Sequence, residues 1–127
     1  MVIIRANEFS RDFEVKPEID RDTLLEKALI FIDEEVQETK DAIAANDREE
    51  IIDGFGDVAF LALNGIYKEF RSMGDDHDTA TEKVTEVMTR ICNANLGKKQ
   101  SDGTIKYVNG KVQKPEGWMP PQYKDML

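Results

Sequence analysis

The sequence has little cysteine, histidine or proline, and each shortage limits the structures it can form. Its one cysteine, Cys92, has no partner for a disulfide within the chain, so we expect a reducing, cytoplasmic setting and a small packing role. Its one histidine, His77, cannot supply the Glu-x-x-His pairs of a di-iron bundle, and we interpret it as a capping or surface residue. Three of the four prolines lie beyond residue 96, in a segment of different composition.

Basic charge and long apolar runs are also scarce. The 127 residues include 17 Lys and Arg against 26 Asp and Glu, which gives a net charge of −9. Binding nucleic acid through its phosphates needs clustered cations, so we expect no nucleic-acid partner. No apolar run approaches the length of about 18 residues that a membrane helix needs, and the opening MVIIRANEFSRDF is unlike a signal peptide. We therefore expect a cytoplasmic protein with no membrane partner.

The apolar residues recur at helical spacing through most of the chain. They predict a short helix over residues 4–14 that Pro17 interrupts, followed by three long helices. The long helices are expected at about 20–44, 47–73 and 75–95. The middle one is apolar around most of its circumference, so we expect it to be the most buried.

Polar residues and glycines mark where these helices begin and end. Asp20 or Asp22 can cap the first long helix. Asp47, with Glu50 three residues later, resembles a capping box at the start of the second, and Gly74 is suited to its C-terminal end.

The composition changes from Gly97 onward. The tail holds four of the eight glycines, six lysines and Trp118, the only tryptophan, which we expect to pack against a neighbouring subunit or to cap a pocket. Ser101-Asp102-Gly103 and Val108-Asn109-Gly110 are turn signals, and the second is compatible with a short hairpin. We predict a single all-α domain over 1–127, with a helical bundle as its body (about 4–96) and an irregular tail (about 97–127).

The chain is richest in acidic residues between residues 33 and 57. Two sets each share one helix face: Glu34, Glu35 and Glu38 on the first long helix, and Glu50, Asp53 and Asp57 on the second. When a chain turns near Asn46 and forms two antiparallel helices, two residues that lie at the same height on the two helices have residue numbers with a constant sum. Glu38 with Asp53 gives 91 and Glu35 with Asp57 gives 92, so the two sets lie at matching heights, on axes about 8–10 Å apart.

Two interpretations of this acidic region remain open. Runs of charge on helices usually form a face exposed to water. If the two sets turn toward each other, the carboxylates repel, and divalent cations remove the conflict. Mg²⁺ suits this role, with Mn²⁺ as an alternative, because it prefers oxygen ligands and keeps waters that a phosphate substrate can replace.

Two short motifs resemble the all-α nucleoside triphosphate pyrophosphatases, the superfamily of MazG, the dimeric dUTPases and phosphoribosyl-ATP pyrophosphatase. EEVQE at 34–38 resembles their Glu-x-x-Glu motif, and EEIIDGFGDVAF at 49–60 resembles their second motif. The tail, with NANLGKK and DGTIKYVNGKVQKPEGWMPP, is similar to MazG-like proteins of phages and bacteria. The resemblance implies a MazG-like fold and a homodimer or homotetramer. An isolated copy would also leave the apolar second long helix poorly covered.

The resemblance also implies metal ligands. Glu35 and Glu38 match those of the first motif. The second motif fits in two registers: Glu50 with Asp53 is the literal match, whereas Asp57 directly precedes the apolar run as the family's Asp does. In the second register Gly54 stands where the family has Glu, and Asp53 would replace it.

The activity implied is Mg²⁺-dependent hydrolysis of a nucleoside triphosphate to the monophosphate and pyrophosphate. Glu34 or Glu35 would orient the attacking water, and Asn95, Lys98, Lys111 and Lys114 would contact substrate. Because Gly54 departs from the family pattern, the alternative is a non-catalytic helical oligomeric module that binds metal or nucleotide.

Overall fold

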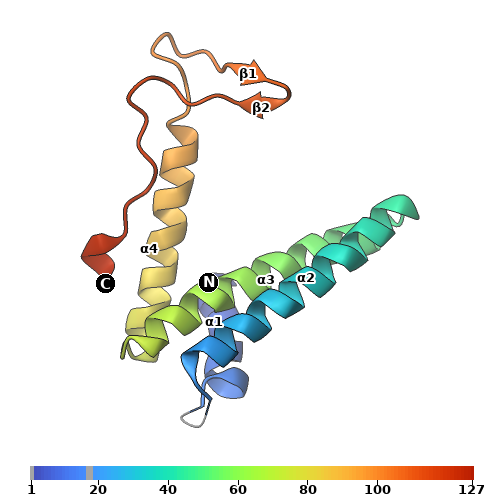
Figure 1. The fold of residues 1–127 in the computed structure, drawn as a ribbon, viewed down its shortest axis with the longest axis vertical. Helices are drawn as coiled ribbons and strands as arrows, with labels where there is room; N and C mark the ends of the chain where they lie inside the picture. Colours follow the sequence, from blue (N-terminus) through green and yellow to red (C-terminus); the bar gives the residue numbers. More distant parts are fainter. Residues whose placement is uncertain (1, 17–18) are drawn as a thin grey trace. The chain divides into compact units, whose positions relative to one another are not determined.

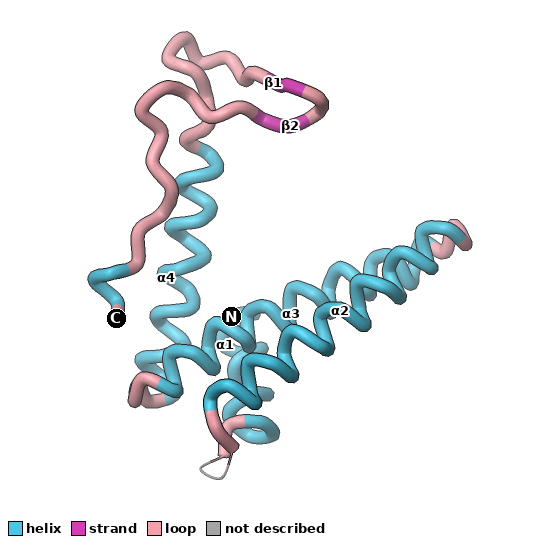
Figure 2. The backbone as a smooth tube through the Cα atoms, in the orientation of Figure 1, coloured by secondary structure: helices cyan, strands magenta, loops and turns pink. Residues whose placement is uncertain are grey.

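The computed structural model describes residues 2–16 and 19–127, and is mostly helical (Figures 1 and 2). Helices make up 68% of the described structure, which confirms the predicted all-α fold with a short hairpin in the tail. The elements are α1 (Val2–Phe9), the π-helix η1 (Ser10–Glu14), α2 (Arg21–Ala44), α3 (Arg48–Ser72), α4 (His77–Leu96), β1 (Tyr107–Val108), β2 (Lys111–Val112) and the 3₁₀ helix η2 (Lys124–Met126). Pro17, where we predicted an interruption, lies outside the described residues. None of the described helices is long and apolar enough to cross a membrane.

The chain forms two compact units, residues 1–84 and 85–127. The boundary falls inside α4, whereas the sequence predicted a change of character at Gly97. The prediction of one domain over 1–127 stays a prediction.

The predicted helix boundaries in the first unit are close to those observed. Asp20 caps α2 by accepting a hydrogen bond from the backbone N–H of Thr23 at 2.8 Å. Asp47 caps α3 in the same way, but the predicted capping box does not form, because the backbone N–H of Asp47 donates to the Ala42 carbonyl. At the other end of α3, Gly74 has φ of +98°, a conformation that glycine adopts without strain.

Helices α2 and α3 are antiparallel and lie side by side along most of their length (Figure 1). Gly54 of α3 is buried against Thr39 of α2, and a Cβ atom at position 54 would overlap the Thr39 hydroxyl. Thr39 is itself fixed by donating its hydroxyl to the Glu35 carbonyl at 2.7 Å. The absence of a side chain at Gly54 therefore allows the helix spacing on which the acidic residues depend.

The N-terminal segment packs on α3 through both aromatic and charged contacts. Phe9 of α1 meets the edge of Phe60, with ring centroids 5.4 Å apart. Lys68 of α3, whose side chain is only 2% exposed, forms an ion pair of 2.8 Å with Glu14 of η1. These contacts hold α1 and η1 beside α3.

Of the three long helices, α3 has the most buried residues, as predicted, and much of its apolar surface is uncovered in a single copy, as was also expected. Its fully buried apolar side chains are confined to Tyr67 and Phe70 among the described residues, whereas Ile52 is 74% exposed and Phe55 is 62% exposed. A helix that is apolar around most of its circumference can bury most of its surface, but a single copy of the chain does not supply enough neighbours to cover it.

The tail contains the predicted hairpin. Strands β1 and β2 pair antiparallel, with Tyr107 opposite Val112. Asn109 and Gly110 connect them with φ of +52° and +75°, the two positive angles that a tight two-residue hairpin turn requires.

Candidate active site

Four of the predicted acidic residues come together between α2 and α3. Glu35 and Glu38 on α2 interact electrostatically with Asp53 and Asp57 on α3. Each pair is one helical turn apart, and the two helices present them at matching heights, as the sums of their numbers predicted. The antiparallel packing at Gly54 therefore joins two sets that are about 20 residues apart in sequence.

The carboxyl groups of Glu35 and Asp57 are perturbed by this arrangement. Partial burial raises the pKa of Glu35, and the nearby charges of Glu38, Asp57 and Asp53 raise it further. Partial burial also raises the pKa of Asp57, with Asp53 as the next cause. Both shifts have the same origin: removal from water and like charges each disfavour the ionised form. The cluster therefore favours binding of a cation or a proton.

Glu34 and Glu50 lie outside this cluster. Both side chains are exposed, and neither is among the main causes of the pKa shifts of Glu35 and Asp57. Glu50 sits in the first turn of α3, where its backbone N–H donates to Asp47. Of the two registers considered for the second motif, the geometry brings Asp53 and Asp57, rather than Glu50, to the residues of the first.

The donor set of the cluster suits a hard divalent cation. Glu35, Glu38, Asp53 and Asp57 offer only carboxylate oxygens, which Mg²⁺ and Mn²⁺ accept. Throughout 2–16 and 19–127, no group of three or more His, Cys, Asp or Glu side chains is already arranged to hold a metal ion. The carboxylates are thus close enough to repel one another, and binding an ion would require their side chains to turn inward.

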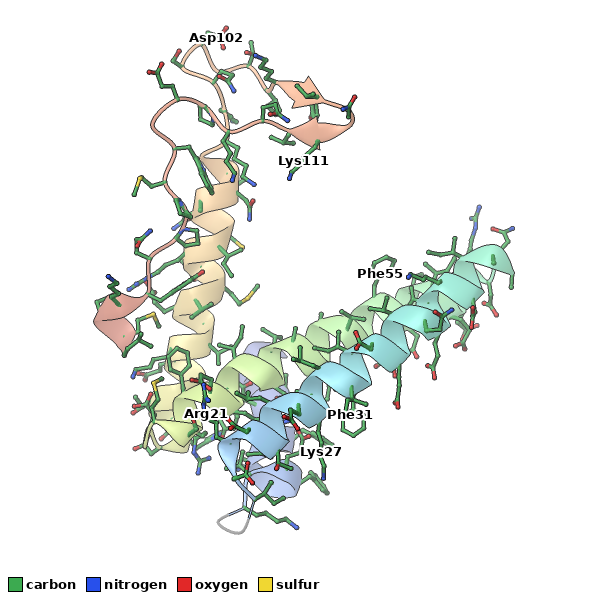
Figure 3. All side chains as sticks on the ribbon, viewed as in Figure 1. Arg21, Lys27, Phe31, Phe55, Asp102 and Lys111 are labelled. Atoms are coloured by element: carbon green, nitrogen blue, oxygen red, sulfur yellow. The ribbon has the colours of Figure 1, made fainter. Side chains whose placement is uncertain are left out.

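An aromatic pocket adjoins the acidic cluster, and its cavity measures about 370 Å³. We call it the phenylalanine pocket; it is lined by Phe9, Phe13, Glu14, Phe31, Glu35, Asp57, Phe60 and Leu61. Phe31 projects from α2 (Figure 3), and the other aromatic residues come from α1, η1 and α3. Sequence reasoning missed this pocket; the only signal was that Phe9 and Phe13 lie one turn apart.

Two of the predicted substrate-binding lysines meet in the second unit. The ammonium groups of Lys98 and Lys114 lie 5.3 Å and 5.0 Å from the centre of the Trp118 ring. Trp118 is fixed in turn, because its indole N–H donates to the Ala94 carbonyl at 2.7 Å. Trp118 therefore packs within its own unit and lies close to two positive charges, and its predicted packing against a neighbouring subunit stays a prediction.

The other two predicted substrate-binding residues are placed differently. The Asn95 amide donates to the Ile91 carbonyl of its own helix at 3.0 Å, although Asn95 also lines a small cavity with Lys98. Lys111 is exposed on β2 of the hairpin (Figure 3). The structure thus groups Lys98 with Lys114 and leaves Lys111 apart.

His77 and Cys92 differ in part from what we expected. His77, at the start of α4, is half-buried, and its Nδ1 lies 2.9 Å from the Tyr67 hydroxyl. That hydroxyl also accepts a hydrogen bond from Arg71 at 2.6 Å, so His77 joins a polar cluster instead of facing water. Cys92 is exposed, and the prediction that it packs is wrong for a single copy.

Comparison with known proteins connects this geometry to a family. Residues 7–86 match the family model PRA-PH, described as Phosphoribosyl-ATP pyrophosphohydrolase. The matched range includes both acidic motifs and the phenylalanine pocket, and excludes the tail. No curated protein and no solved structure matches the chain significantly.

Proposed function

The chain belongs to the phosphoribosyl-ATP pyrophosphohydrolase family, and from this we propose that it hydrolyses a nucleoside triphosphate to the monophosphate and pyrophosphate. The family lies within the MazG-like all-α pyrophosphohydrolase superfamily and acts on nucleotide phosphoanhydride bonds. What supports the finer proposal is one observation: carboxylates of α2 and α3 lie close enough to interact electrostatically, with the pKa values of Glu35 and Asp57 raised.

The proposed cofactor is Mg²⁺, with Mn²⁺ as a substitute. Its ligands would be the four carboxylates of the acidic cluster: Glu35, Glu38, Asp53 and Asp57. These carboxylates interact electrostatically, and a bound cation would remove the repulsion between them. A bound divalent ion supplies charge neutralisation to phosphate oxygens and lowers the pKa of a coordinated water. Gly54 does not weaken this proposal, because Asp53 and Asp57 supply two carboxylates from α3 without it.

The chemical step requires one water and one proton acceptor. Water adds to the α-phosphorus, the bond from that phosphorus to the bridging oxygen breaks, and pyrophosphate leaves. Of the two candidates for the acceptor, Glu35 is better placed than Glu34, since Glu35 belongs to the cluster and Glu34 is exposed outside it.

The tail is proposed to contact the triphosphate. Lys98 and Lys114 present two ammonium groups on one indole ring, and such a pair favours an anion. Asn95 and Lys111 are weaker candidates, since Asn95 is bonded to its own helix and Lys111 stands apart.

The test is pyrophosphate release from a panel of ribo- and deoxyribonucleoside triphosphates and phosphoribosyl-ATP, with and without Mg²⁺. Glu38→Gln keeps the size of the side chain and removes one proposed ligand charge. Glu49→Gln is the matched control, because Glu49 is exposed and lies outside the cluster. We expect Mg²⁺-dependent release by the wild type and by Glu49→Gln, and at least a hundredfold loss in Glu38→Gln, of the order seen when one transition-state charge contact is removed.

Two other results would change the proposal. Release from phosphoribosyl-ATP alone would replace the triphosphate substrate with that nucleotide. No release from any substrate, by a folded protein whose melting temperature still rises with Mg²⁺, would overturn catalysis and favour a binding module.

A further inference from the structure

We propose that the phenylalanine pocket binds the base of the substrate nucleotide, so that the base lies beside the acidic cluster that faces its phosphates. This inference rests on the proposed function only where it calls the bound nucleotide the substrate. The evidence for a base in the pocket is independent of hydrolysis and comes from its rings, its carboxylates and the way η1 is held.

The rings of the pocket offer flat apolar faces. Phe9 and Phe13 stack with centroids 4.9 Å apart and an interplanar angle of 24°, and Phe60 meets Phe9 edge-on. Phe13 is 67% exposed and Phe31 is 41% exposed, so part of the aromatic surface is still open. Stacking on such a surface is how proteins bind bases without regard to sequence, because every base has a π face.

The position of the pocket links it to the phosphates. Glu35 and Asp57 belong both to the acidic cluster and to the lining of the pocket. A nucleotide whose phosphates lie at these carboxylates therefore has an apolar cavity directly beside them. The volume of about 370 Å³ lies within the range of small-molecule pockets, which runs from about 300 to 1,000 Å³.

The element that carries Phe13 is held firmly in an uncommon conformation. Ser10–Glu14 is a π-helix, a rare form that occurs mostly as a single turn and is frequent at functional sites. Glu14 fixes it, because one carboxylate oxygen accepts from the Ser10 hydroxyl and the other from the Lys68 ammonium, both at 2.8 Å. Ser10 and Lys68 are buried, so the π-helix is anchored from inside and Phe13 is presented outward.

Glu14 also faces the pocket and is suited to contact the edge of a base. Each carboxylate oxygen accepts more than one hydrogen bond, so the bonds to Ser10 and Lys68 leave acceptor capacity. Bases carry N–H donors on their edges, and a carboxylate at the wall of the pocket can accept from them. A base with an exocyclic amino group is therefore the favoured ligand.

A second copy of the chain is the competing occupant of this apolar surface. Three carboxylates, those of Glu14, Glu35 and Asp57, line the pocket. Covering Glu35 and Asp57 with an apolar surface would remove two neighbouring negative charges from water, which is costly. A nucleotide brings N–H donors to Glu14 and cation-bound phosphates to Glu35 and Asp57. The pocket therefore suits a nucleotide base better than a second copy of the chain.

The first experiment uses tryptophan reporters and neutral nucleosides without any divalent cation. Phe13→Trp places a fluorophore in the pocket, and Phe55→Trp places one on α3 outside it, at a similar exposure of 62% (Figure 3). The wild type, with Trp118 alone, gives the background. We expect saturable quenching by adenosine and cytidine at millimolar concentrations in Phe13→Trp only. Equal quenching in all three proteins, or none in a folded Phe13→Trp, would overturn the inference.

The second experiment uses affinity and kinetics. Phe13→Ala should weaken adenosine binding, followed by NMR, about 10- to 100-fold, the effect expected for losing one stacking contact. If the wild type hydrolyses a nucleotide, the KM for it should rise similarly, while hydrolysis of tripolyphosphate, which has no base, should not change. If the wild type binds nucleosides in the pocket but hydrolyses no nucleotide, the proposed function is refuted and the pocket is still a base-binding site. A Phe13→Ala protein that changes its oligomeric state but binds adenosine normally would assign the pocket to a second copy.

Discussion

At the scale of single residues, Gly54 has the clearest physical role. Compared with the family motif, it stands where a glutamate ligand is expected, which suggested a weakened site. The structure shows that position 54 faces α2 and has no room for any side chain beside Thr39. A glutamate there would push the helices apart, so the ligand set on α3 has to come from the neighbouring helix faces at Asp53 and Asp57.

Gly54→Ala should therefore destabilise the protein by about 1–3 kcal/mol, the usual cost of overpacking. Gly56→Ala on the same helix is the matched control, because nothing lies within 4 Å of a Cβ there. Alanine has the higher helix propensity, so Gly56→Ala should be neutral or stabilising by up to about 1 kcal/mol. Urea denaturation of both variants measures the difference, and equal stabilities would contradict the close approach. Thr39→Ala should partly rescue Gly54→Ala.

Asp57 gives a second prediction at this scale. Because its pKa is raised, its ionised form is less favourable in the folded chain than in the unfolded chain at neutral pH. Asp57→Asn should therefore raise the melting temperature without divalent cations and reduce the rise caused by Mg²⁺. Asp33→Asn, at an exposed position of α2, should leave both quantities near those of the wild type. A lower melting temperature for Asp57→Asn in metal-free buffer would refute this account of the cluster.

At the scale of secondary-structure elements, a buried ion pair decides where η1 lies. The Lys68 side chain is 2% exposed and that of Glu14 is 20% exposed, so the two partners are not equivalent. Removing Glu14 leaves a buried ammonium without a counter-charge, whereas removing Lys68 leaves a carboxylate that still reaches water and Ser10.

Glu14→Gln should therefore cost more stability than Lys68→Met, with a loss of about 3 kcal/mol or more for Glu14→Gln. Methionine fills a similar volume to lysine and carries no charge, so Lys68→Met should lose less. Thermal or denaturant unfolding of the two variants gives the ranking. The opposite ranking would contradict the unequal burial of the two partners.

At the scale of the whole molecule, apolar side chains on the first unit lack partners in a single copy. Ile43 and Ile52, near the turn between α2 and α3, are 54% and 74% exposed, and Phe55, one helical turn after Ile52, is 62% exposed. Val36, Ile43, Phe55 and Val58 also line an apolar cavity of about 160 Å³. Exposed apolar patches of this kind mark interaction sites, which supports our proposal of a homodimer or homotetramer.

Ile52→Asp should therefore dissociate the proposed oligomer, because it places a charge on that surface without disturbing buried contacts of one copy. Leu127→Asp is the control, since Leu127 is 78% exposed at the end of the chain. Sedimentation velocity over a range of concentrations measures the outcome. A wild type that is monomeric at all concentrations would refute the proposal.

The sequence by itself determined the helices and the pairing of the acidic sets. Periodicity placed α2, α3 and α4 to within a few residues, Asp20, Asp47 and Gly74 marked their ends, and the sums of residue numbers paired α2 with α3 correctly. These features are local, or follow from one short turn, so spacing alone predicts them.

Tertiary structure decided what spacing does not encode. Which face of α3 meets α2 depends on the fit of Gly54 against Thr39, and this selected Asp53 and Asp57 over Glu50. The phenylalanine pocket needed three chain segments to meet, and the π-helix of η1 depended on the buried contact between Glu14 and Lys68. Packing between distant residues is set by shape and by charge removed from water, and neither is visible as a period in the sequence.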